Sequence, residues 1–119
     1  MRKRPRKKRL EHFRRRAAPG TAPGTLIAHP EARATQVDVL AFGADGVLEQ
    51  RGASVGELKA IADRHAVTWI NVEGTKDVEF LAELGQVFAL HPLALEDASN
   101  LHQRAKLEEY DEHSFLVLR

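Results

Sequence analysis

Two adjacent carboxylates in this sequence, Glu96 and Asp97, are of a type that could bind a metal ion. Mg²⁺ is a hard cation that is commonly held by one or two carboxylates together with retained waters. An acidic pair on an arbitrary helix is more often a solvated patch, so the pair alone does not establish a site. The sequence contains no cysteine, so any bound metal would have oxygen or imidazole ligands.

Three histidines, His91, His102 and His113, recur every eleven residues. Imidazole ligands suit Co²⁺ or Zn²⁺. We expect the three in different settings, however: His91 before the proline that starts a helix, His102 in a turn and His113 in the last strand region. A centre shared by all three is therefore not predicted.

No catalytic motif is present. The sequence lacks a nucleophile elbow, a phosphate-binding loop, a dinucleotide-binding glycine pattern and a zinc-protease motif. Ser54 is explained by helix capping. We therefore predict that the protein is not an enzyme.

Charge divides the chain of 119 residues, whose formal net charge is +1, into two parts. Residues 1–16 contain ten Lys and Arg against one acidic residue, a net charge of +9, and the remainder has eight against sixteen, a net charge of −8. The basic run should be disordered. It is either a solvated tail without a specific ligand, or residues 2–16 contact an anionic membrane surface or nucleic acid.

The Pro-Gly pairs at 19–20 and 23–24 favour turns and extended backbone, so residues 1–25 read as a basic tail with a linker and residues 26–119 as the folded domain. No apolar run approaches the about 18 to 20 residues that span a bilayer, and no secretion signal precedes the domain. We expect the chain as given to be soluble.

The elements that must position the carboxylates can be traced from residue 36. Alternating residues at 36–40, a turn at 43–46 and residues 47–50 predict a β-hairpin. Ser54 and Glu57 have the spacing of a capping box for a helix that runs to about Arg64.

The second half continues with a strand at 67–72, whose β-branched and aromatic residues predict a position in the middle of a sheet with Trp69 in the core. A helix capped by Asp77 follows and contains Gly85, a sign of close packing, and Pro92 opens another helix. Residues 115–118 form a last strand without an assigned partner. The predicted fold is α/β (α+β), a mixed β-sheet flanked by short helices and incomplete at its C-terminal edge.

Residues 68–119 resemble the CorA family of magnesium and cobalt transporters. The resemblance lies in five segments, which are TWINV at 68–72, FALHPLALED at 88–97, NLHQR at 100–104, KLE at 106–108 and residues 110–119. One departure is Ala105, where the family usually has proline, so that a backbone donor is restored at this turn.

The resemblance implies a cytosolic α/β domain of a homo-pentamer at the inner membrane, with Mg²⁺, or alternatively Co²⁺, as a regulatory ion that favours the closed state. By position, Asp97 corresponds to the carboxylate of a first inter-subunit site and Glu96 to one of a nearby second site. The family's stalk helix, two membrane helices and Gly-Met-Asn pore signature are absent from this sequence. We therefore expect a fragment that senses metal, binds it weakly by itself and cannot transport.

Two alternatives stay open: a nucleic-acid-binding module that uses the basic arm, and a stand-alone interaction module. The sequence identifies neither the transported cation nor the direction of transport.

Overall fold

The computed structural model describes residues 19–100 and 103–119. The predictions for the basic run at 1–16 and for His102 lie outside these residues. The described elements, in chain order, are β1 (Gln36–Gly43), β2 (Gly46–Arg51), α1 (Val55–Arg64), β3 (Val67–Glu73), α2 (Val78–Val87), α3 (Pro92–Ser99), β4 (Lys106–Glu109) and β5 (Ser114–Val117).

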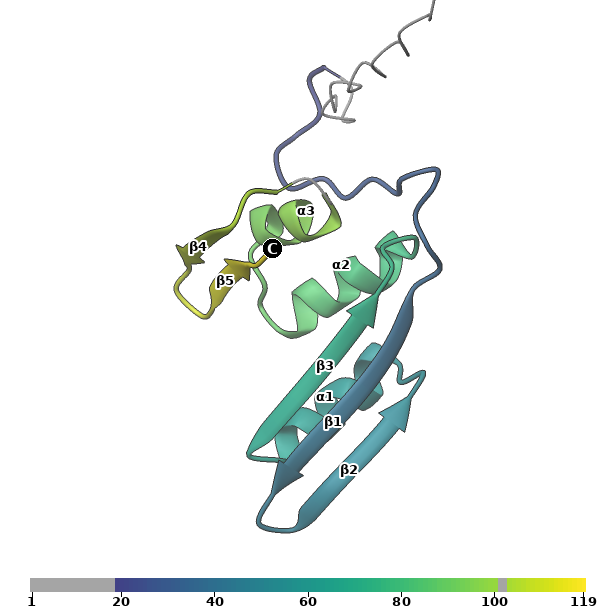
Figure 1. Cartoon of the computed structure of the whole chain (residues 1–119), viewed down its shortest axis with the longest axis vertical. Coiled ribbons are helices and arrows are strands. Elements are labelled where there is room, and N and C mark those ends of the chain that lie inside the picture. Colours follow the sequence, from purple (N-terminus) through teal and green to yellow (C-terminus); the bar gives the residue numbers. More distant parts are fainter. Residues whose placement is uncertain (1–18, 101–102) are drawn as a thin grey trace, which may run out of the picture.

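The strands form two antiparallel sheets, one of three strands in the order β2-β1-β3 and one of the two strands β4 and β5. Figure 1 shows the β4–β5 hairpin beside α3, at the opposite end of the molecule from the β1–β2 turn. The predicted α+β class with short flanking helices is confirmed. The last strand, β5, pairs with β4 and not with the first sheet.

Local signals produce the first half of the domain as predicted. Gly43 pairs with Gly46 across the β1–β2 turn, and Gly46 has φ of 116°, which a side chain would disfavour. The capping box of α1 is confirmed: the Ser54 N–H donates to Glu57 Oε2 at 2.8 Å, and the Glu57 N–H donates to Ser54 Oγ at 3.3 Å. Two otherwise unpaired amides are thereby satisfied at the start of the helix.

The hydrophobic core lies between one face of the three-stranded sheet and α1. Leu58 of α1 is fully buried, and the inward residues of β1 alternate along the strand as a half-buried strand requires. The core cluster consists of Val37, Val39, Ala41, Ala53, Val55, Leu58, Ile61 and Leu84.

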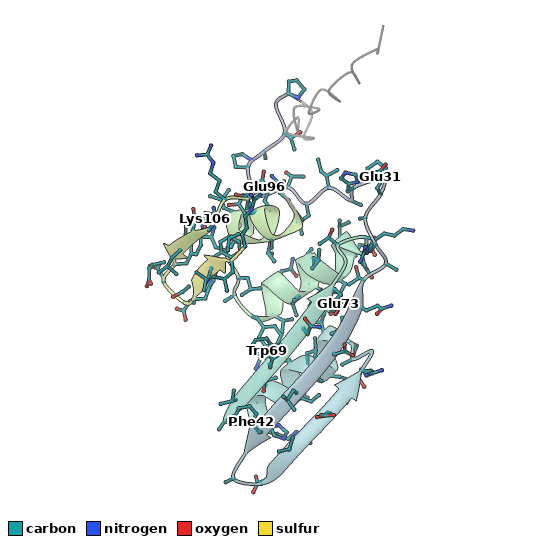
Figure 2. The ribbon with its side chains drawn as sticks, viewed as in Figure 1. Glu31, Phe42, Trp69, Glu73, Glu96 and Lys106 are labelled. Atoms are coloured by element: carbon teal, nitrogen blue, oxygen red, sulfur yellow. The ribbon has the colours of Figure 1, made fainter. Side chains whose placement is uncertain are left out.

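The prediction for β3 and Trp69 is wrong. β3 is an edge strand, since β1 occupies the centre of the sheet, and the Trp69 side chain is 67% exposed. Trp69 lies opposite Leu40 on the sheet face that points away from α1, beside the exposed Phe42 and Val67 (Figure 2). Both faces of β3 are apolar, but within the described residues only one is covered.

Close packing between α2 and α3 sets the position of the acidic pair. Gly85 of α2 is buried, and a Cβ at this position would stand 2.2 Å from Leu95 Cδ1 of α3. The close packing predicted for Gly85 is thus confirmed. The chain then turns through Ala89, whose φ is 52°, and Pro92 takes the first position of α3 as predicted.

No helix among the described residues has both the length and the apolar character needed to cross a bilayer.

Candidate metal-sensing site on helix α3

Asp97 lies on the side of α3 that meets the C-terminal hairpin. Its Oδ2 atom is 2.5 Å from the Lys106 ammonium, at the start of β4, and its Oδ1 atom accepts a hydrogen bond from Gln103 Nε2 at 2.9 Å. Both carboxylate oxygens therefore have partners within this chain. The side chains of Asp97 and Lys106 are each 26% exposed, so the ion pair lies at the border between interior and solvent.

Lys106 also binds a second carboxylate, with its ammonium 2.8 Å from Glu108 Oε1. The hydrogen bonds to Asp97 and then to Glu108 raise the pKa of Lys106 to about 12. Lys106 in turn lowers the pKa of Glu108. The Tyr110 hydroxyl donates to the remaining Glu108 oxygen at 3.1 Å, and this chain of contacts joins α3 to the hairpin.

Glu96 serves a different part of the molecule. Its Oε2 atom accepts a hydrogen bond of 2.7 Å from the backbone N–H of Gly24, which is 72 residues away in sequence. Gly24 has φ of 83°, and a Cβ there would stand 2.7 Å from Pro92 Cβ. Glu96 thus attaches the Pro-Gly segment to α3 (Figure 2).

The acidic pair fits a hard divalent cation in its donor chemistry, because carboxylate oxygens are the ligands that Mg²⁺ prefers. Both carboxylates already have partners, however. Asp97 binds Lys106 and Gln103, and Glu96 accepts a hydrogen bond from Gly24. In the described part of the chain, no group of three or more His, Cys, Asp or Glu side chains could hold a metal ion. Further ligands would have to come from outside these residues.

His91 and His113 lie closer together than the sequence analysis predicted. Both stack against the Tyr110 ring, with centroid distances of 4.4 Å for His91 and 4.9 Å for His113. The His91 N–H reaches His113 Nε2 at 3.5 Å, and His91 Nδ1 accepts from the Leu93 N–H as the cap of α3. Both imidazoles thus stack on the same tyrosine, and these contacts join α3 to the hairpin.

Sequence reasoning missed Lys106, Glu108 and Tyr110. Their spacing was a usable signal, because alternate residues of a strand project from the same face. Lys106, Glu108 and Tyr110 are each two residues apart, so all three lie on one side of β4 and of the residue that follows it. What the spacing does not reveal is that this side faces Asp97.

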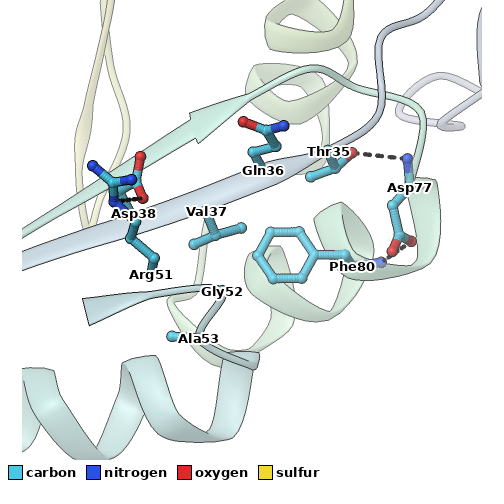
Figure 3. Close-up of a pocket in the computed structure, with 9 residues that line it drawn as sticks. All are labelled: Thr35, Gln36, Val37, Asp38, Arg51, Gly52, Ala53, Asp77 and Phe80. Carbon is cyan, nitrogen blue, oxygen red and sulfur yellow. Dashed lines mark hydrogen bonds and ion pairs between the residues drawn. The ribbon is translucent and has the colours of Figure 1, made fainter.

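An open pocket beside the N-terminal end of β1 gives no competing site (Figure 3). Four of its lining residues are paired with one another: the Asp77 N–H donates to Thr35 Oγ1 at 3.0 Å, and Arg51 pairs with Asp38 at 3.7 Å. The Phe80 ring forms part of its wall.

Comparison with known proteins gives a relationship over most of the chain. No family model matches. The chain is 32% identical over 111 residues to the protein named cobalt/magnesium transport protein CorA of Thermotoga maritima, an alignment that covers 92% of this chain. The chain spans only 32% of that relative's length. This similarity over 92% of the chain, together with the HPLALED segment at 91–97, supports a CorA-type domain.

Proposed function

We propose that this domain is the cytosolic, metal-sensing part of a divalent-cation transporter for Mg²⁺ or Co²⁺. The observation that carries the proposal is Asp97, a partly exposed carboxylate that already binds a cationic group at the junction of α3 and the hairpin. The relative's name supplies the class of ion. In this proposal the domain regulates transport, catalyses no reaction and does not itself conduct ions.

The proposed mechanism is electrostatic. Residues 17–119 carry a net charge of −8, so copies of the domain arranged in a homo-pentamer repel one another. A divalent cation would supply positive charge between neighbouring subunits. Asp97, with Glu96 beside it, would contribute carboxylate oxygens to this inter-subunit site, and the remaining ligands would come from the adjacent subunit. An ion that binds the closed assembly better than the open one shifts the population toward closure.

The test is the Asp97→Ala variant of the full-length protein, with Mg²⁺ supplied on the cytoplasmic side of the membrane. We expect this variant to stay open at Mg²⁺ concentrations that close the wild type, measured as cation flux into vesicles. Asp63→Ala is the matched control, because this variant also loses a surface ion pair, the one between Asp63 and Lys59 on α1, and it should close as the wild type does. Unchanged inhibition of the Asp97 variant would remove Asp97 from the sensing site.

Glu96→Ala carries a second expectation, because Glu96 also holds Gly24. Loss of sensing together with release of residues 19–25, seen as faster amide exchange at Gly24, would agree with both roles. Glu96→Gln should keep the Gly24 contact, since its amide oxygen can still accept the hydrogen bond. Full Mg²⁺ inhibition in that variant would leave Glu96 with the structural role alone.

We further propose that the basic run at 2–16 contacts anionic lipid headgroups, in keeping with a domain positioned near a membrane. Deletion of these residues should abolish co-sedimentation with phosphatidylserine vesicles and leave the fold intact. Tight, salt-sensitive binding to DNA by the same run, without binding to vesicles, would favour the nucleic-acid alternative.

A further inference from the structure

The Lys106 ammonium occupies the position next to Asp97 that an external cation would need. It stands 2.5 Å from Asp97 Oδ2 and 2.8 Å from Glu108 Oε1, between a carboxylate of α3 and one of β4. These two anions come from different elements, nine and two residues away from Lys106.

The surroundings hold both carboxylates in this orientation. Gln103 donates to the other oxygen of Asp97, and the Tyr110 hydroxyl donates to the other oxygen of Glu108. Each carboxylate is thus fixed at one oxygen and directed at Lys106 with the second. Such an arrangement limits the side-chain entropy that an ion pair at an exposed surface normally loses when it forms.

The aromatic ring of Phe115 adds to the same preference for positive charge. It lies 5.4 Å from the ammonium, within the range in which a ring face attracts a cation. A lysine ammonium is charged throughout the physiological pH range. Lys106 is therefore a permanent cation at the Asp97 carboxylate, and two positive charges so close together repel.

We propose that Lys106 is a tethered competitor for the divalent cation at Asp97, so that metal binds only when it displaces the ammonium. This inference rests on the proposed function of Asp97. Its consequence is that Lys106 sets the metal concentration at which the site fills, and that the domain alone binds metal weakly because no neighbouring subunit helps to displace the ammonium.

The experiment compares Mn²⁺ binding to the full chain, followed by the electron paramagnetic resonance signal of free Mn²⁺ at low ionic strength. Lys106→Met keeps most of the side-chain stem and removes the charge. We expect this variant to bind Mn²⁺ about tenfold more tightly than the wild type, since a nearby positive charge no longer opposes the ion. Lys106→Arg keeps the charge and should bind as weakly as the wild type.

Two further variants locate the effect. Lys59→Met is the matched control, since Lys59 pairs with the single carboxylate of Asp63 on α1, and it should leave Mn²⁺ affinity unchanged. Adding Asp97→Asn to Lys106→Met should abolish the gained affinity. Circular dichroism melting checks that each variant is folded, and Lys106→Gln replaces the methionine variant if that one does not fold.

The proposal is overturned if the charge-removing variant binds Mn²⁺ no better than the wild type, if Lys59→Met gains as much, or if the gain survives Asp97→Asn. These results are distinct from failure of the proposed function. Mg²⁺ closure that depends on Asp97, without any effect of Lys106, would leave the sensing role standing. Gained Mn²⁺ affinity at Asp97, with closure independent of Asp97, would support the competition and refute the sensing role.

Discussion

Replacing Gly85 with alanine tests the packing that places α3, and with it Asp97, against α2. Two effects oppose each other in this variant. Alanine is favoured over glycine inside a helix by about 1 kcal/mol. The new Cβ, however, would stand 2.2 Å from Leu95 Cδ1 and 3.5 Å from Leu95 Cγ, closer than van der Waals contact allows at the first of these atoms.

The obstruction is the terminal methyl of a flexible, half-buried leucine, so Leu95 must change its rotamer to admit the new Cβ. Overpacking a well-filled contact costs about 1 to 3 kcal/mol, because side chains leave their rotamers or the backbone shifts. With about 2 kcal/mol for the contact and about 1 kcal/mol recovered from helix propensity, Gly85→Ala should reduce the free energy of unfolding by about 1 kcal/mol. In a Leu95→Ala background the obstruction is absent, so the same change should stabilise by up to about 1 kcal/mol.

Urea denaturation of the four proteins in this double-mutant cycle measures the coupling between Gly85 and Leu95, which we expect to be about 2 kcal/mol. Gly56→Ala in α1 is the control, because a Cβ there meets nothing within 4 Å, and it should be neutral or stabilising. If Gly85→Ala stabilises equally in both backgrounds, the two helices do not require the close approach that the structure shows, and the reasoning fails.

Three further predictions concern the fold. Trp69 is the single tryptophan and is 67% exposed, so acrylamide should quench the fluorescence of the native chain nearly as well as that of the unfolded chain; strong protection would place it in a core. Hydrogen bonds from Ser54 lower the pKa of Glu57 below its ordinary 4.5, so the stability from this cap is complete above pH 4.5 and is lost as the pH falls through the lowered value. Glu57→Gln should therefore be less stable than the wild type at neutral pH. Its unfolding free energy should also fall less steeply as the pH is lowered through this range. Gly74→Ala should lower the melting temperature markedly, since Gly74 has φ of 78° and a Cβ would stand 2.4 Å from the Ala34 carbonyl oxygen; an unchanged melting temperature would contradict this geometry.

Much of the local structure was predictable because its signals lie within a few residues of one another. The capping box at Ser54 and Glu57, the turn between β1 and β2 and the proline at the start of α3 each depend on neighbours in the chain. The resemblance to the CorA family also came from local segments within residues 68–119, and the comparison over 92% of the chain agrees with it.

The position of Trp69 was not predictable in the same way. An apolar strand can lie at the centre or at the edge of a sheet, and only the pairing order distinguishes the two. β1 pairs with both β2 and β3 and takes the central place, so β3 has one free edge and one uncovered face among the described residues. The composition of the strand is the same in either case.

The sequence by itself indicated most of the helices and strands, the resemblance to the CorA family and the acidic pair at 96–97. The tertiary structure decided what those carboxylates contact: Glu96 holds the backbone of Gly24, and Asp97 is paired with Lys106. The physical reason is that a carboxylate binds whichever donor the packing brings to it. The close fit of Gly85 against Leu95 and the pairing of β4 with β5 determine those donors, and the local sequence does not reveal which residues will meet in this way.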